Sequence, residues 1–110
     1  MKLPNADRAL VDIGKLRDYC LSSSHPRGKH KARVFAEALG LGEADAEVLQ
    51  AALQQAAITE EATATDADEY GQRFVLDFDM TTKAGTARIR SAWMIRTGES
   101  FPRLVTLYVL

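Results

Sequence analysis

The spacing of apolar residues divides the chain into a helical half and a strand half. Up to residue 57, apolar positions recur every three or four residues, as they do along one face of a helix. Asp12 precedes the first series as a candidate N-cap, and Gly40 follows the second as a C-terminal stop. The pattern predicts three helices, over about residues 11–21, 28–39 and 43–57.

From residue 73 the apolar positions alternate with polar ones, which is the pattern of a half-buried strand. The segments TKAG and TGESFP carry turn residues between the alternating stretches. The pattern predicts strands over about residues 73–80, 87–96 and 103–110, with Val105, Leu107 and Val109 on one side of the last. ITEEATAT, residues 58–65, is either a weak fourth edge strand or a polar linker.

Strands joined by short turns predict an antiparallel meander, and helices that precede them predict the α+β class. A length of 110 residues suits one domain with its own core. We therefore expect a single domain over residues 1–110, with about three helices packed on one face of a three- to four-stranded antiparallel meander. The helical part would span about residues 9–57 and the sheet part about 58–110.

The strand pattern also predicts an open sheet face. If the helices cover the apolar face, the other face displays Arg73, Arg88, Arg90, Thr106 and Tyr108. An antiparallel sheet can leave one face in contact with water. This face is therefore either a binding surface or simply the solvated side of the strands.

Composition and charge narrow the class of protein. The hydrophobic content of 46% and the single cysteine are typical of a globular protein from a reducing compartment. The N-terminus has no long apolar run, so we expect no signal peptide, no membrane partner and a cytoplasmic location. The net charge is −1, yet residues 1–42 carry eight Lys/Arg against four acids and residues 43–79 carry ten acids and one arginine. Because the charges are unevenly distributed along the chain, the protein can still have a local basic surface despite its net charge.

The most unusual segment is SSSHPRGKHKAR, residues 22–33, which contains both histidines, four Lys/Arg and no acid. Cations in the first turn of the predicted second helix oppose its dipole, at about 0.3–1 kcal/mol per charge. A helix N-terminus favours a bound anion instead. The segment is either an anion site or a solvated connection. The expected anion-binding residues are Arg27, Gly28, Lys29, His30, Arg88 and Arg90.

The two histidines add a candidate for chemistry. Neighbouring cations disfavour the imidazolium, which leaves a neutral ring that can exchange protons near pH 7. A base of this kind, with cations that stabilise charge on a phosphate, suffices for metal-free RNA cleavage. Asp77 and Asp79 share a strand face but lack a third ligand, so we expect no metal and no cofactor. Cys20 lies on an apolar stripe and is expected in the core.

Three segments, KLRDYCLSSSHPRGKHKARVF, EYGQRFVLD and GTARIRSAWMIRTGESFPRLVTLYV, resemble a bacterial domain of unknown function over about residues 5–109. Its pattern is roughly K-L-x-x-Y-L-L, H-P-x-G-x-x-K-A-x-F, Y-G, G-x-x-A, V-x-T-x-W-x-I and P-R-L-V-T-x-Y. The chain departs from it at Ala92, where the pattern has threonine, and in its YVL ending. The matching positions are His25, Pro26, Gly28, Lys31, Ala32, Phe35, Tyr70, Gly71, Trp93, Arg103, Thr106 and Tyr108.

The resemblance implies a place among polymorphic toxins, because such domains occur alone or at the C-terminal ends of larger phage-head or secreted proteins. The layout of helices and sheet is also similar to the barnase, EndoU, colicin and RelE class of ribonucleases. The candidate catalytic residues are His25 as base or acid, with Lys31, Arg103, Thr106 and Tyr108 on the phosphate and His30 as the alternative base.

Three functions remain open at this point. The chain is an interaction module that binds a toxin, an antitoxin or a phage protein, a metal-independent ribonuclease, or an RNA or anion binder without chemistry. The ribonuclease requires that the segment of residues 25–31 lie close to Thr106 and Tyr108, because the groups must converge on one phosphate. The oligomeric state is not determined by the sequence.

Overall fold

The computed structural model describes all 110 residues, and its helices occupy the first half of the chain. Asp12 caps α1 (Ile13–Lys15) by accepting a hydrogen bond from the Gly14 N–H at 2.9 Å, and Gly40 ends α2 (Lys29–Leu39) with φ of +65°. Both end signals are therefore confirmed. The helical elements are η1 (Ala6–Arg8), α1 (Ile13–Lys15), η2 (Leu16–Cys20), α2 (Lys29–Leu39), η3 (Glu43–Asp45) and α3 (Ala46–Thr59).

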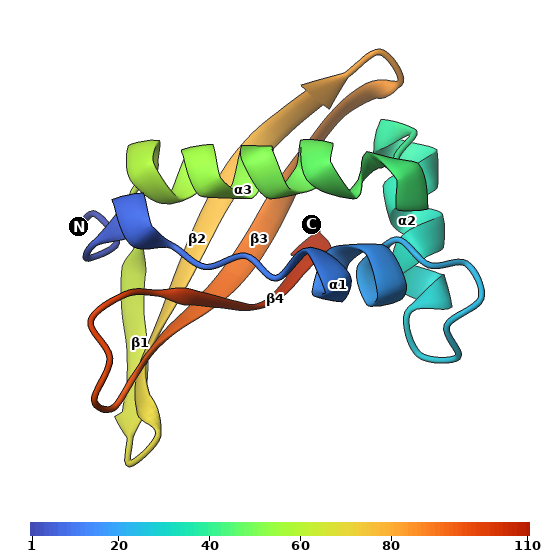
Figure 1. Cartoon of the computed structure of the whole chain (residues 1–110). Coiled ribbons are helices and arrows are strands. Elements are labelled where there is room, and N and C mark those ends of the chain that lie inside the picture. The colour runs from blue at the N-terminus through green and yellow to red at the C-terminus, as the bar shows by residue number, and fades with distance from the viewer.

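Four antiparallel strands follow the helices in the order β1-β2-β3-β4. They are β1 (Thr63–Asp68), β2 (Gly71–Thr82), β3 (Gly85–Arg96) and β4 (Arg103–Val109). The α+β meander is thus confirmed (Figure 1). The weak strand exists but begins at Thr63, because α3 continues to Thr59 and occupies the start of the segment assigned to it.

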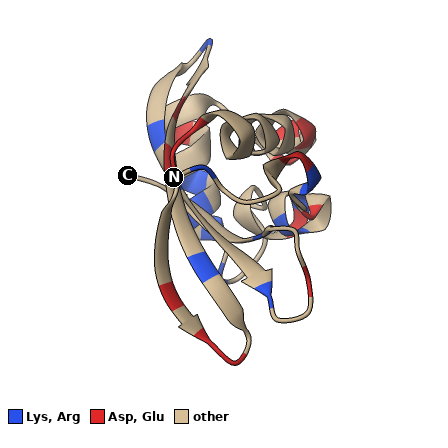
Figure 2. Cartoon of the chain, turned by 90° about the vertical axis from the view of Figure 1, so that its left-hand side faces the viewer, with Lys and Arg blue, Asp and Glu red and all other residues tan.

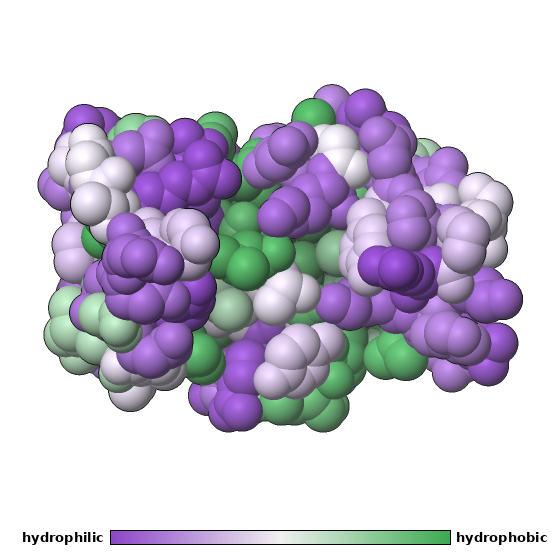
Figure 3. All heavy atoms as spheres, turned by 90° about the horizontal axis from the view of Figure 1, so that it is seen from below, coloured by the Kyte–Doolittle hydropathy of each residue, from purple (hydrophilic) through white to green (hydrophobic).

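The helices and the inner face of the sheet form one core. Figure 2, seen from the side, shows the sheet on the left and the helical layer on the right. Phe74, Leu76 and Phe78 of β2 and Ile89 and Trp93 of β3 are buried in a cluster with residues of α2, α3 and η2. None of the helices is long and apolar enough to cross a membrane. Seen from below, the molecule is hollowed at its centre, with hydrophobic residues at the floor of the hollow (Figure 3).

Strand β4 departs from the predicted alternation. The pattern placed Val105, Leu107 and Val109 on one side, but the register shifts between Ala92 and Trp93, and Val105 is the extra residue. The bulge turns Leu104 and Leu107 toward the core, while Val105 is 43% exposed. The prediction is therefore wrong for Val105, whereas Leu107 is buried and Val109 packs against the core, because strict alternation holds only where the ladder is regular.

The outer edge of β4 is covered by the N-terminal segment. The Leu10 N–H donates to the Pro102 carbonyl at 2.9 Å, and the Leu104 N–H donates to the Leu10 carbonyl at 3.0 Å. A few residues further along, Lys15 donates from Nζ to the Val105 carbonyl at 3.0 Å. These bonds hold α1 and η2 beside β4 and set the walls of the site described below.

A buried hydrogen-bond chain links two strands of the core and yields a stability prediction. Trp93 donates from Nε1 to Ser91 Oγ at 2.9 Å, and Ser91 donates to the Leu76 carbonyl at 2.7 Å. Ser91→Ala leaves the indole N–H without a partner in the core. We expect the free energy of unfolding, measured with urea, to fall by about 1–3 kcal/mol.

Ser23→Ala is the control, because Ser23 is exposed and makes no side-chain hydrogen bond. It should change stability by less than about 0.5 kcal/mol. Equal stabilities for the two variants would contradict the role assigned to Ser91.

Candidate functional site

The segment between η2 and α2 folds back against the first helix because residue 28 is glycine. A Cβ at Gly28 would lie 2.1 Å from the Tyr19 carbonyl oxygen, so no other residue fits this approach. The backbone here is right-handed helical, with φ of −83°. The requirement is therefore for space and not for an unusual backbone angle.

His25 closes this turn with its own ring. Nδ1 accepts hydrogen bonds from the backbone N–H groups of Arg27 and Gly28, both at 3.0 Å. An accepting Nδ1 carries no proton, so the proton of the neutral ring is on Nε2. The ring packs edge-on to Tyr19, with centroids 4.6 Å apart. With Nδ1 occupied in this way, the Nε2–H of His25 can donate a hydrogen bond, and no unprotonated ring nitrogen is left free to act as a base.

Lys31 connects the turn to the last strand. Its Nζ donates to Thr106 Oγ1 at 3.1 Å, across 75 positions of sequence, and lies 5.8 Å from the centre of the Tyr19 ring. None of the ion pairs in the chain includes Lys31. His25, Lys31, Tyr19 and Thr106 therefore form one cluster with an ammonium group that no carboxylate neutralises. We refer to these four residues as the phosphate cluster, after the ligand that we propose for them.

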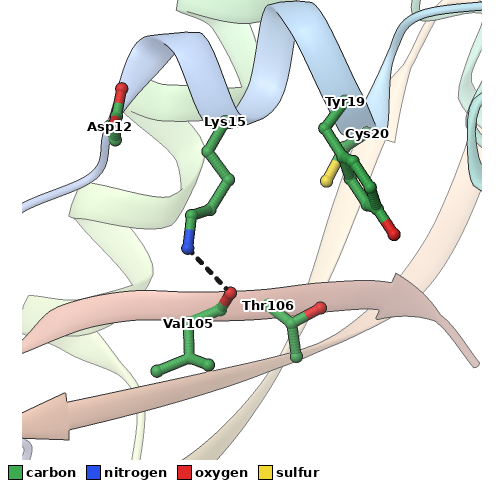
Figure 4. A pocket seen from close by; sticks show the side chains of 6 residues that line it. All are labelled: Asp12, Lys15, Tyr19, Cys20, Val105 and Thr106. Carbon is green, nitrogen blue, oxygen red and sulfur yellow. Dashed lines mark hydrogen bonds between the residues drawn. The ribbon is translucent and has the colours of Figure 1, made fainter. Parts of the chain in front are cut away.

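Next to this cluster is a slot between the first helix and β4. It has a volume of about 480 Å³ and is lined by Asp12, Lys15, Tyr19, Cys20, Val105 and Thr106. In Figure 4 Lys15 and Tyr19 extend toward β4, with the Cys20 sulfur between them. Burial raises the pKa of the Cys20 thiol, and the ammonium groups of Lys31 and then Lys15 oppose that rise. Both lysines are therefore close enough to Cys20 for their charges to affect the pKa of its thiol.

Sequence reasoning missed Tyr19 and Lys15. They are four positions apart on one helix face, and that spacing is a signal for two neighbouring side chains. It did not identify a site, because an aromatic residue and a lysine at helical spacing occur on many surface helices. Their function as slot walls depends on β4, which lies far away in sequence.

The basic residues of the open sheet face are not free. Arg90 binds both oxygens of Asp77 at 2.8 Å, and Arg88 binds Asp79 at 3.0 Å. Hydrogen bonds from Arg90 lower the pKa of Asp77, and Asp77 followed by the Tyr108 hydroxyl raises the pKa of Arg90. Because each charge has its opposite beside it, this face offers no excess positive charge.

The remaining predicted residues lie outside the phosphate cluster. Arg103 binds Glu99 through two hydrogen bonds, at 2.8 and 2.7 Å, and its guanidinium stacks 5.2 Å from the centre of the Phe101 ring. Tyr108 is exposed opposite Arg90 in the sheet register. Arg27, Lys29 and His30 are exposed and make no ion pair. The structure thus unites His25, Lys31 and Thr106, but not Arg103 or Tyr108, in the cluster.

Comparison with known proteins adds a family and a fold. The model of a family described as a domain of unknown function (DUF6883) matches residues 2–110. Among curated proteins no sequence matches the chain. Among solved structures it is similar to a chain of a "Contact-dependent growth inhibition toxin - immunity protein complex from Klebsiella pneumoniae 342", with a TM-score of 0.69 and 17% identity, over 92% of this chain and 99% of that one. At this identity the likeness shows a shared fold.

Proposed function

Because the chain belongs to a family described as a domain of unknown function (DUF6883), its membership names no activity, and we propose the function from the site itself. The chain is a metal-independent ribonuclease domain that acts as the toxin of a bacterial toxin–immunity pair. RNA is its substrate, which places the reaction in the cytoplasm, and an immunity protein is its protein partner.

The observation that carries this proposal is the contact between Lys31 and Thr106. The contact brings the basic turn of α2 onto β4 and puts an ammonium, a hydroxyl and the His25 ring around Tyr19. An ammonium without a carboxylate partner attracts an anion, whereas the sheet arginines are already paired. The phosphate cluster therefore combines an unpaired ammonium with a hydroxyl and a ring N–H that can donate hydrogen bonds to the same anion.

The cluster can promote RNA cleavage by stabilising charge. In the reaction the ribose 2′-oxygen forms a bond to phosphorus and the bond from phosphorus to the 5′-oxygen breaks. Solvent takes the 2′ proton and returns one to the 5′-oxygen, so no co-reactant is consumed. Lys31 and the Nε2–H of His25 would bind the phosphate oxygens whose negative charge grows in the transition state, and this stabilisation is a large term in such reactions. Thr106 would hold the Lys31 ammonium in place.

The test is cleavage of RNA by the purified protein in EDTA. We expect products that end in a 2′,3′-cyclic phosphate and a 5′-hydroxyl, and no cleavage of DNA of the same sequence, because DNA lacks the 2′-hydroxyl. Cleavage of DNA at the same rate, or activity that requires a metal, would overturn the mechanism.

A second candidate is an interaction module without chemistry. The structural neighbour favours it, since that chain was solved within a toxin–immunity complex. Under this alternative the basic turn binds a toxin, an antitoxin or a phage protein through an acidic surface. Normal growth of bacteria that overproduce the wild-type chain, together with intact cellular RNA, would favour the module over the ribonuclease.

A further inference from the structure

The slot beside the phosphate cluster has a partly hydrophobic lining, which the binding of a phosphate does not require. It is lined by three hydrophobic residues, Tyr19, Cys20 and Val105, together with Asp12, Lys15 and Thr106. Tyr19 and Thr106 also belong to the phosphate cluster, so the slot and the cluster share a wall. A ligand whose anionic group is held by Lys31 would therefore have its next few atoms at the slot.

We propose that the slot binds the nucleobase adjoining the phosphate held by Lys31, with the base stacked on the Tyr19 ring. This inference rests on the proposed function: the phosphate cluster would bind the phosphate of the RNA, and the slot would bind the base next to it. Aromatic side chains are common platforms for unpaired bases of single-stranded RNA. The volume of about 480 Å³ is enough for a base and part of its ribose.

The local backbone supports this assignment. The first helix ends in a π-helical turn, in which the Leu21 N–H donates to the Leu16 carbonyl at 2.9 Å. Turns of this kind are rare and are frequent at functional sites. Here the turn contains both Tyr19 and Cys20. Lys15 is fixed on the other side, since its Nζ donates to the Val105 carbonyl, and it leaves its aliphatic stem toward the slot (Figure 4).

Charge favours a nucleotide over an apolar ligand. Lys15 and Lys31 both lie close enough to the Cys20 thiol to lower its pKa, and neither is neutralised by an acid. A purely apolar occupant would leave these two ammonium groups with only neutral oxygen atoms as partners, the Val105 carbonyl and Thr106 Oγ1. A base joined to a phosphate satisfies both the apolar lining and the positive charge.

The experiment compares adenosine 5′-monophosphate with ribose 5-phosphate, which has the same phosphate and no base. Binding to the full chain is followed by calorimetry and by the backbone amide shifts of the labelled protein. We expect the nucleotide to bind about 5- to 100-fold more tightly. Only the nucleotide should shift the amides of Cys20 and Val105, whereas both ligands should shift those of Lys31 and Thr106.

Two substitutions separate stacking from structure. Tyr19→Phe keeps the ring and should retain the preference for the nucleotide, whereas Tyr19→Leu should remove it. Equal binding of the two ligands to the wild type, or base-dependent shifts away from Cys20 and Val105, would overturn the slot. RNA cleavage with equal binding would leave the ribonuclease standing without the slot. If the protein prefers the nucleotide but does not cleave RNA, the slot is supported and the ribonuclease activity is contradicted.

Discussion

Replacing Lys31 by methionine is expected to lower the rate of RNA cleavage by at least about 100-fold, the loss typical when one donor to a growing negative charge is removed. Methionine keeps the unbranched stem beside the Tyr19 ring and removes the ammonium. The interaction with Thr106, at 3.1 Å, is lost as well. The rate is measured on a labelled RNA in EDTA under single-turnover conditions, so that binding and cleavage are read separately.

The matched control is Lys29→Met. Lys29 stands two positions earlier on the same helix turn, is exposed and makes no side-chain hydrogen bond or ion pair. It should change the rate only a few-fold, through weaker attraction of the RNA. Lys31→Met should remain folded, with a loss of stability of about 1 kcal/mol or less for the single hydrogen bond. A folded Lys31→Met variant that is as active as Lys29→Met would remove Lys31 from the catalytic site.

Gly28→Ala is expected to have the second large effect, on both stability and activity. The added Cβ would lie 2.1 Å from the Tyr19 carbonyl oxygen and 2.8 Å from its carbon, and both are backbone atoms that cannot rotate away. Relief requires the turn to move away from the first helix, which separates His25 and Lys31 from Tyr19. We expect a loss of about 1–3 kcal/mol in the free energy of unfolding.

The activity of Gly28→Ala should fall by more than the fraction of protein that unfolds, because the molecules that stay folded have a displaced turn. Gly42→Ala serves as the comparison, since nothing lies within 4 Å of a Cβ at that position and its φ of −125° suits any residue. That variant should keep its activity and change stability by less than about 1 kcal/mol. If the two alanine variants unfold at the same urea concentration, the steric argument for Gly28 fails.

The helices were predictable because their signals are local. Asp12 and Gly40 mark helix ends through contacts with residues a few positions away, and the structure contains both contacts. The meander was predictable for the same reason, since short turns join strands that are neighbours in sequence. The bulge in β4 was not, because the insertion depends on the ladder with β3 and leaves the composition of the strand unchanged.

The candidate site divides along the same line. The basic turn was visible as a segment that opposes the dipole of its own helix, and it contains two members of the phosphate cluster. Arg88 and Arg90 of the sheet were expected to bind an anion, yet each is paired with an acid on the neighbouring strand. The alternation of polar and apolar residues indicates on which face of the sheet a side chain lies. It does not report what stands opposite that side chain across the strands, which is set by register.

The sequence by itself thus determined the helices, the meander and the position of the basic turn, since each depends on residues close together in the chain. Only the tertiary structure decided that Lys31 meets Thr106, that His25 has its Nδ1 occupied, and that Tyr19 and Lys15 wall a slot. The reason is physical: contacts between residues far apart in sequence arise from how the helical layer packs on the edge strand, and no local pattern encodes that packing.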